Sequence, residues 1–478
     1  MIKHKKQHGE TGKHQESSDT DSPNAAKWLE PARELPVSAA YDVIVCGAGP
    51  AGCAAALAAS RYGCKTLIVE KYGYAGGATV SQFVMPVLSM NGVDLEGVWH
   101  EWMHTLAAMG GVSPLEANRG RKVDGSVDPE LVKYAWEKML QDANVDILYH
   151  VIVANTVVSN GKISGIVVET VRGREVISGK RVIDCTGDGI VCAMASVPWE
   201  QGGDDGICAM ALTKPFRLGN TKKPDDMPSE KYDKMIDEGF SRAIENNEFT
   251  EPIVTTGSIV GNVKRWTRPL ANRPEMLIGS SKVLNINPLD PWQLSRAEQM
   301  ARKQIEQIRD FHLRYCPGCE NAYFLDTSAH IGIRSTRRIC GMERVTKSDA
   351  LNFVKKIDSI AKSSWHIDIW PHDNYTQPAN RSSDEWIAEV RRGNWFDIPF
   401  GCIIPVEVDN LLVAGRCISS DHWAQSSLRI QQTCQSTGQA AGTIAALSLK
   451  SNIVPRKLSP ALAVHALKND REKVKRYI

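Results

Sequence analysis

The stretch "YDVIVCGAGPAGCAAALAASRYGCKTLIVEK", from Tyr41 to Lys71, carries the strongest structural pattern of the chain. It reads as a strand in "DVIVCG", a glycine turn, a helix through "AGCAAALAASRYG" and a second strand in "KTLIVEK". The turn places Gly47, Gly49 and Gly52 at the spacing G-x-G-x-x-G. In this strand–turn–helix–strand order the spacing predicts a dinucleotide site. It does not distinguish a nicotinamide nucleotide from a flavin nucleotide.

The three glycines have separate expected roles. Gly47 permits the tight turn, Gly49 lets the backbone approach a pyrophosphate, and Gly52 lets helix and strand pack closely. Glu70, at the end of the second strand, suits the ribose hydroxyls. Gly76-Gly77 in "KYGYAGGATVS" indicates a second loop along the cofactor, because only glycine tolerates such close approach. Cofactor contacts are also expected for the adjoining residues Pro50, Ala51, Lys71, Ala78 and Thr79.

Composition narrows the class of protein. The 478 residues include 57 Lys plus Arg and 55 Asp plus Glu, which leaves a net charge of +2. This balance gives no indication of a nucleic-acid or membrane partner. The N-terminal residues are polar and lack the apolar segment of a secretory signal. Without an export signal, the twelve cysteines are expected to be reduced thiols in a cytoplasmic protein.

The order of patterns predicts an α/β protein with an inserted lobe. Strand-like runs with turns at Asn160-Gly161 and Arg172-Gly173 follow the first unit, and helical spacing covers about 294–314. We expect a disordered polar tail (1–38), the first segments of a Rossmann-like domain (39–200), and a mixed α+β substrate lobe with interleaved segments (201–394). The remaining parts are the C-terminal segment of the Rossmann-like domain (395–449) and a terminal helix or tail (450–478).

Several blocks carry a resemblance to a known family. They are "VIDCTGDG", "PGCENAYF", "IGIRSTRRICG", "WHIDIW", "FDIPFGCIIP" and "NLLVAGRCISSDHWAQSSLRIQQTCQSTGQAAGTIAAL". From Tyr41 to about Leu449 the chain resembles FAD-dependent oxidoreductases of the glutathione-reductase superfamily. The resemblance implies a GR2-type FAD domain, with cofactor contacts at Val153, Thr186, Gly187 and Asp188. Cys319 and Trp370 depart from this family, which commonly has an aromatic residue and a histidine there.

The C-terminal block favours FAD over a nicotinamide nucleotide. In "NLLVAGR", Gly415 and Arg416 are expected to contact the sugar–phosphate arm of the flavin. The helix that follows contains Gly438 and other small residues, so we expect its surface to lie near the isoalloxazine ring. Its N-terminus, placed near 427–429, would direct about half a positive charge at the ring. No second G-x-G-x-x-G opens a nicotinamide domain, so the substrate itself is the expected hydride donor.

The expected reaction is oxidation of a small organic metabolite, with hydride passing to flavin N5 and a proton to a base. His422 is the first candidate for that base, because it follows the flavin-contacting strand. His366 with Asp368 is the second, since alternation in "WHIDIW" puts both on one face of a strand. Arg429 is a candidate for binding a carboxylate or the flavin. Arg334, with Arg337 and Arg338, forms either an anion-binding set or salt links between lobes.

Two other interpretations stay open. Cys316-x-x-Cys319 has a redox or metal spacing, but no second pair completes a zinc site, so no metal is expected and incidental thiols are favoured. The alternatives are a dithiol–disulfide flavoenzyme using this pair and a flavin-binding subunit without catalysis. The expected partner is a small-molecule substrate, and the electron acceptor is open between O₂, a quinone and a redox protein.

Overall fold

The computed structural model describes residues 29–86, 97–112, 126–203, 210–222, 227–255, 268–269, 273–370 and 384–475. The chain divides into two compact units, Met1–Leu35 and Pro36–Ile478. Every helix and strand given below belongs to the second unit. Most of the predicted polar tail, residues 1–28, lies outside the described residues. Residues 29–36 have no regular secondary structure, and the first strand begins at Val37, five residues before the predicted strand that starts at Asp42.

The main sheet has seven strands in the order β3-β2-β1-β6-β5-β4, with β15 paired to β6. The parallel pairs are β1 with β2, β1 with β6, β2 with β3 and β6 with β15. The pairs β4 with β5 and β5 with the start of β6 are antiparallel. The bounds are β1 (Val37–Cys46), β2 (Thr66–Val69), β3 (Asp146–Leu148), β4 (Ile152–Ser159), β5 (Lys162–Thr170), β6 (Gly173–Asp184) and β15 (Leu411–Val413).

The turn chemistry of the sequence explains the hairpins. Asn160 and Gly161 join β4 to β5 with φ values of 49° and 70°, which suit the two-residue turns that asparagine and glycine favour. Gly173, which opens β6, has φ 106°. Both predicted turn positions are confirmed.

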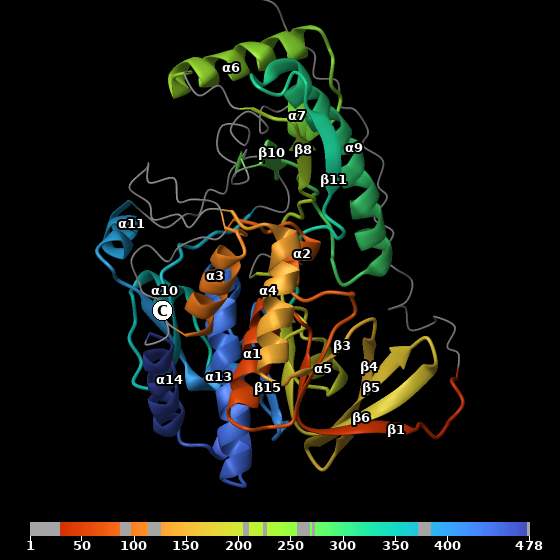
Figure 1. The fold of residues 1–478 in the computed structure, drawn as a ribbon, viewed down its shortest axis with the longest axis vertical. Helices are drawn as coiled ribbons and strands as arrows, with labels where there is room; N and C mark the ends of the chain where they lie inside the picture. The colour runs from red at the N-terminus through yellow and green to blue at the C-terminus, as the bar shows by residue number, and fades with distance from the viewer. Residues whose placement is uncertain are drawn as a thin grey trace, which may run out of the picture. The chain divides into compact units, whose positions relative to one another are not determined.

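Two helices pack closely beside the parallel strands. α1 (Pro50–Arg61) and α13 (Gln431–Lys450) lie side by side (Figure 1). A Cβ atom added to Gly438 would lie 2.0 Å from the Ala51 carbonyl oxygen, and one added to Gly442 would lie 2.1 Å from that of Ala55. Small residues therefore let the two backbones touch. Gly438 therefore packs on α1, and it is not among the residues that line the cavity described below.

Shorter elements complete this part of the fold. The helices are α2 (Ala78–Ser81), α3 (Val98–Ala108), α4 (Pro129–Asp142), α5 (Ile190–Met194), α10 (Lys347–Leu351), α11 (Asp384–Arg391), α12 (His422–Leu428) and α14 (Pro460–Lys475). Two strand pairs are antiparallel, β7 (Trp199–Gln201) with β12 (Arg337–Ile339) and β13 (Ser359–Ser363) with β14 (Phe396–Pro399). Single 3₁₀ turns cover Phe400–Ile403 and Pro455–Lys457.

A second sheet carries its own hydrophobic core. Its order is β11-β8-β10-β9, and helices α6, α7 and α9 accompany it (Figure 1). The bounds are β8 (Phe216–Gly219), β9 (Arg268–Pro269), β10 (Glu275–Ile278), β11 (Tyr323–Thr327), α6 (Ser229–Glu245), α7 (Pro252–Thr255) and α9 (Pro291–Tyr315). The predicted helix at 294–314 is confirmed. It begins three residues earlier because Asp290 caps it and Pro291 occupies its first position.

His312 lies in this second core and makes folding sensitive to pH. Its side chain is fully buried beside Phe216 and Phe311, and Nδ1 lies 2.7 Å from the Ile308 carbonyl oxygen. Burial lowers the pKa of His312 from 6.5 to about 4. Between these values the unfolded chain binds more protons than the folded chain, so stability falls as pH falls.

We expect His312→Gln to reduce that loss, because glutamine can still bond the Ile308 carbonyl but does not titrate. Urea unfolding at pH about 7 and about 4.5 should show a loss roughly 2–3 kcal/mol smaller in the variant. Equal losses in both proteins would mean that the buried ring does not stay neutral.

Among the described residues, no helix combines the length and apolar character that crossing a bilayer requires.

Candidate functional site

A cavity of about 340 Å³ lies at the carboxyl ends of four parallel strands. Residues that directly follow β1, β2, β6 and β15 line it, namely Gly47, Glu70, Cys185 and Ala414. This edge of an open parallel sheet is where such folds bind ligands. The volume falls in the range of roughly 300–1,000 Å³ that is usual for ligand pockets.

The glycine turn forms one wall of the cavity. Gly47 has φ 99°, and an added Cβ would lie 2.7 Å from the Cys185 carbonyl oxygen; at Gly52 it would lie 1.8 Å from that of Gly47. The protein itself therefore requires glycine at both positions. Gly49 differs, because its φ is −75° and the nearest atom to an added Cβ, Gly77 Cα, lies 3.9 Å away. Glycine at 49 leaves room for a ligand, which fits the pyrophosphate of a dinucleotide.

Glu70 is held in place at the end of β2. One carboxylate oxygen accepts the Ala48 N–H at 2.7 Å, and the other accepts the Tyr72 N–H at 3.1 Å. The residue is 8% exposed, and burial raises its pKa although both N–H groups oppose the shift. Each oxygen can accept more than one hydrogen bond. Glu70 thus remains able to bind the two ribose hydroxyls.

The second glycine loop packs against the first. Gly77 has φ 50°, and an added Cβ would lie 2.6 Å from Gly49 Cα. The Gly76 N–H donates to the Ala48 carbonyl at 2.8 Å. Gly77 and Ala78 line the cavity, whereas Thr79 supports it by donating to the Gln431 side chain at 2.7 Å.

Arg416 joins three chain segments at the cavity wall. Its guanidinium donates to the Gly187 carbonyl at 2.7 Å, the Ile333 carbonyl at 2.6 Å and the Asp188 carboxylate at 2.6 Å. Burial would raise the pKa of Asp188, but Arg416 and the Thr336 hydroxyl outweigh it and lower that pKa. Thr186, Gly187, Gly415 and Arg416 line the cavity, as predicted for cofactor contacts. Asp188 does not line it and instead positions Arg416.

Val153 is not brought to the cavity. It lies in β4 and pairs with Val168 of β5, and it is absent from the lining residues. The backbone next to Glu70 belongs to Val151, whose N–H donates to the Glu70 carbonyl at 3.1 Å. Val153 thus lies two residues beyond the backbone that meets Glu70, and its contact with the cofactor stays a prediction.

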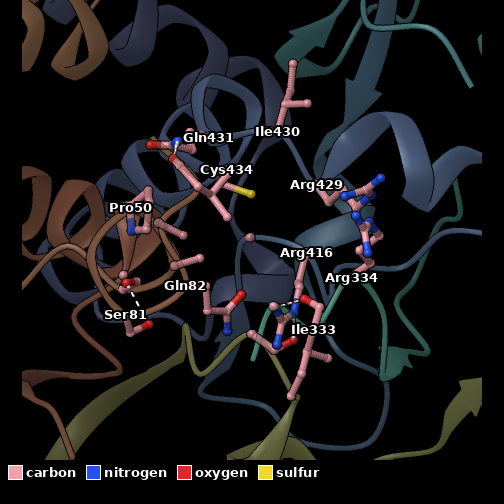
Figure 2. A pocket seen from close by; sticks show the side chains of 18 of the residues that line it. Pro50, Ser81, Gln82, Ile333, Arg334, Arg416, Arg429, Ile430, Gln431 and Cys434 are labelled. Carbon is pink, nitrogen blue, oxygen red and sulfur yellow. Dashed lines mark hydrogen bonds between the residues drawn. The ribbon is translucent and has the colours of Figure 1, made fainter. Parts of the chain in front are cut away.

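Arginine and tryptophan side chains form another wall. Figure 2 shows the guanidinium groups of Arg334 and Arg429 beside each other, across the cavity from Pro50 and Ser81. Arg334 donates to the Ala211 carbonyl and, at 3.0 Å, to the Thr213 hydroxyl, and it lies 4.6 Å from the Trp370 ring centroid. Arg429 donates to the Asp368 carboxylate at 3.1 Å.

The "WHIDIW" segment is not a strand, contrary to expectation. β13 ends at Ser363, and residues 364–370 form no strand apart from an isolated bridge at Asp368. The Ser427 hydroxyl donates to the Trp365 carbonyl at 2.5 Å, and the Asp368 N–H donates to Ser426 at 2.9 Å. These bonds dock the segment on α12. Trp365, Asp368 and Trp370 consequently line the cavity, whereas His366 does not.

His422 also lies away from the cavity lining. It is the first residue of α12 and is 8% exposed. The backbone before it is hydrogen-bonded to other chain segments. The Ser419 N–H donates to the Cys402 carbonyl, and the Asp421 N–H donates to the Val345 carbonyl. Chain order alone had suggested a position near the flavin. The chain instead returns to the cavity after α12, at residues 429–432 and Cys434.

The start of α13 also differs from the prediction. Residues 427–429 are the end of α12, and α13 begins at Gln431. Its first turn lines the cavity, including Gln431, Gln432 and Cys434, none of which was predicted. Among the described atoms, the buried Gln432 Oε1 has no hydrogen-bond partner. This oxygen fits a site that a bound cofactor completes.

Cys316 and Cys319 lie in the second core and not in the cavity lining. Their exposed fractions are 2% and 0%, and burial raises the pKa of both thiols, that of Cys319 to about 12. The Cys319 sulfur contacts that of Met276 at 3.9 Å. Within the described residues, no group of three or more His, Cys, Asp or Glu side chains is arranged to hold a metal.

We expect Cys316→Ala/Cys319→Ala to leave flavin reduction by the substrate unchanged, because neither thiol lines the cavity. Anaerobic stopped-flow reduction of the two proteins provides the comparison. A rate loss of about a hundredfold, roughly 2.7 kcal/mol of barrier, would favour the dithiol mechanism instead.

A parallel sheet with this glycine turn, second glycine loop and buried glutamate defines a dinucleotide-binding protein. The family described as FAD dependent oxidoreductase matches residues 42–470, and the chain belongs to this family. FAD is its cofactor. No curated protein sequence matches the chain.

Three solved structures have a weak likeness to the chain. A geranylgeranyl bacteriochlorophyll reductase-like protein from Thermoplasma acidophilum is 14% identical, over 92% of this chain and 84% of that one, with a TM-score of 0.41. A flavoprotein/dehydrogenase from Cytophaga hutchinsonii is 15% identical over 87% and 80%, with a TM-score of 0.43. The L-proline dehydrogenase from P. horikoshii is 11% identical over 88% and 95%, with a TM-score of 0.39. Likeness at this level says nothing about the substrate.

Proposed function

We propose that the protein oxidises a small organic metabolite and transfers a hydride to N5 of the flavin. The observation that carries the proposal is that one cavity contains both the dinucleotide turn and the Arg334–Arg429 wall. The proposal places a cofactor and a second molecule in this one cavity. We also propose that the fold is of the GR2 type within the glutathione-reductase superfamily.

The proposed substrate lobe corresponds to residues 201–394. In support, the cavity lining includes Thr213, Pro215, Leu277 and Gly279 from this part of the chain. Residues 39–200 and 395–449 supply the glycine turns, Glu70 and Arg416. In this division, one part of the chain holds the cofactor and the other encloses the substrate.

Asp368, backed by His366, is the proposed proton acceptor. When bound, FAD supplies a ring that accepts two electrons and a proton as a hydride. One Asp368 carboxylate oxygen is fixed by Arg429 at 3.1 Å, and the other lies 3.9 Å from His366 Nε2. A hydroxyl or amine proton can pass to the carboxylate at the cavity wall, and His366 can stabilise or receive it. His422 becomes the second candidate, because it does not line the cavity.

An anaerobic screen tests the proposed reaction. The FAD-loaded protein is mixed with fractionated metabolite pools, and loss of the visible flavin absorbance identifies a substrate. We expect at least one small-molecule fraction to bleach the flavin without a nicotinamide nucleotide. Bleaching only by dithiols, or by no fraction at all, would favour the dithiol enzyme or the non-catalytic subunit.

With a substrate in hand, we expect Asp368→Asn to slow anaerobic flavin reduction about a hundredfold, the lower end for loss of a general base. His366→Gln should have a smaller effect, and His422→Gln should react at the wild-type rate. Stopped-flow reduction of all three variants, with FAD content checked, provides the measurement. Loss of rate only in His422→Gln would return the role to that residue. Wild-type rates in all three would indicate a carbon–carbon dehydrogenation.

A further inference from the structure

The wall formed by Arg334 and Arg429 carries more positive than negative charge. Among the described residues, Asp368 is the carboxylate bonded to Arg429, whereas the bonds of Arg334 go to the uncharged Ala211 carbonyl and Thr213 hydroxyl. Burial and the nearby Arg429 lower the pKa of Arg334 to about 9, and Asp368 opposes this. Two guanidinium groups thus face the cavity beside one carboxylate. An anion placed between them would relieve their repulsion.

Arg416 does not add to this excess. It also lines the cavity, but its salt bridge with Asp188 spans 2.6 Å and its other bonds go to backbone carbonyls. Its charge is balanced and its orientation is fixed. Of the three arginines that line the cavity, Arg334 and Arg429 are therefore the two that remain available for an anion.

The phosphates of FAD are not the anion that these arginines suit. The pyrophosphate belongs at Gly49 and the N-terminus of α1, and Figure 2 shows Pro50, the first residue of that helix, across the cavity from both guanidinium groups. Arg334 and Arg429 come from other chain segments, after β11 and after α12. They are placed for a second molecule.

One indole ring lies against Arg334, and a second lines the same cavity. Trp370 lies against the Arg334 guanidinium, with 4.6 Å between the guanidinium carbon and the ring centroid. Trp365 lies next to His366, with 4.5 Å between ring centroids, and both tryptophans line the cavity. Stacking on Trp370 fixes the planar guanidinium. The same rings offer an apolar surface to the rest of a ligand.

We propose that Arg334 and Arg429 bind a carboxylate of the substrate, which is therefore an organic acid whose remaining atoms lie along Trp365 and Trp370. The inference rests on the proposed function for the identity of the bound molecule as substrate. Arginine is suited to this task because its planar fork matches a carboxylate. A hydrogen bond to a charged group contributes about 1.5–3 kcal/mol.

The test measures binding without turnover. Benzoate is titrated into the FAD-loaded protein, and the perturbed flavin absorbance and tryptophan fluorescence give its Kd. Benzamide is the uncharged probe of the same shape, and inorganic phosphate is the anion without an apolar part. We expect benzoate to bind at least about tenfold more tightly than either, as one charge-assisted hydrogen bond implies.

Arg334→Gln is the informative variant, because Arg429→Gln would also leave Asp368 without its cation. We expect Arg334→Gln to weaken benzoate about tenfold to a hundredfold, to leave benzamide unchanged, and to retain FAD. Arg334→Lys should weaken benzoate less. Arg344→Gln is the matched control, since Arg344 pairs with Glu200 and is absent from the cavity lining; it should bind benzoate like the wild type.

Equal affinity for benzoate and benzamide, or for benzoate and phosphate, would overturn the inference. So would unchanged benzoate affinity in Arg334→Gln together with a shifted flavin midpoint potential, because the arginines would then serve the ring. Failure of the proposed function looks different. In that case benzoate binds selectively and needs Arg334, but no organic acid bleaches the flavin.

Discussion

Glu70→Ala is expected to yield a folded protein that retains little FAD. The carboxylate is fixed by the Ala48 and Tyr72 N–H groups, so it is preorganised for the two ribose hydroxyls. Loss of two hydrogen bonds to a charged acceptor amounts to roughly 3–6 kcal/mol, or more than a hundredfold in Kd. Titration of apoprotein with FAD gives the Kd, and chromatography of the flavin released on denaturation identifies FAD.

The control for this variant is Glu70→Gln. Glutamine keeps one acceptor oxygen but loses the charge, so its FAD affinity should fall between those of wild type and Glu70→Ala. Thermal unfolding of the three apoproteins separates cofactor loss from damage to the turn, because the alanine variant leaves the buried Ala48 N–H without the carboxylate. Full FAD occupancy in Glu70→Ala would mean that the ribose binds elsewhere.

Gly438→Ala is expected to destabilise the whole protein. In an ordinary helix this change stabilises by about 1 kcal/mol. Here the new Cβ would lie 2.0 Å from the Ala51 carbonyl oxygen and 2.8 Å from its carbon, so α1 and α13 must separate. We expect a net loss of about 3–5 kcal/mol, which is at the upper end for a single substitution. Urea unfolding or, for a severe effect, soluble yield measures it.

Gly49→Ala provides the matched comparison. Its φ of −75° and the 3.9 Å between an added Cβ and Gly77 Cα, an ordinary van der Waals contact, accommodate a methyl group, so apoprotein stability should change by less than about 0.5 kcal/mol. FAD affinity should nevertheless fall, because the methyl group occupies the space left for the pyrophosphate.

Wild-type stability in Gly438→Ala would contradict the close packing of α1 and α13.

Local patterns with fixed spacing predicted their part of the fold well. The turn at Gly47–Gly52, the strands that flank it and the Asn160-Gly161 hairpin depend on interactions between residues near one another in the chain. The same holds for α9, whose Asp290 and Pro291 mark its start. In each case backbone preference and tertiary structure agree.

Contacts between distant segments were harder to predict. The glycine at position 438 indicates that another group comes close to this helix, but the sequence does not say whether that group is a cofactor or a second helix. The break between α12 and α13 also has no clear signal, because Ile430 occupies the N-cap of α13 and provides no side-chain cap. The sequence therefore favours a single continuous helix from 427, and it gives no reason to expect Gln431 and Gln432 in the cavity lining.

The position of catalytic candidates depended on loops whose path the sequence does not specify. Counting along the chain from Gly415 predicts that His422 lies near the flavin, but hydrogen bonds to Cys402 and Val345 direct the intervening backbone elsewhere. From the sequence, Trp370 is recognisable only as a departure from the family, which commonly has a histidine at this position. In the structure Trp370 lines the cavity and lies against Arg334. An indole ring at this position offers different chemistry from a histidine.

The packing of α1 on α13 has a consequence for biosynthesis. The first of these helices leaves the ribosome early, whereas its partner and Gly415 are made several hundred residues later. Since a growing chain emerges at about 5–20 residues per second, the nucleotide turn waits roughly 20–80 seconds for the segments that complete its surroundings. Insertion of the flavin is therefore expected to follow translation, and a polypeptide truncated before α13 should remain colourless.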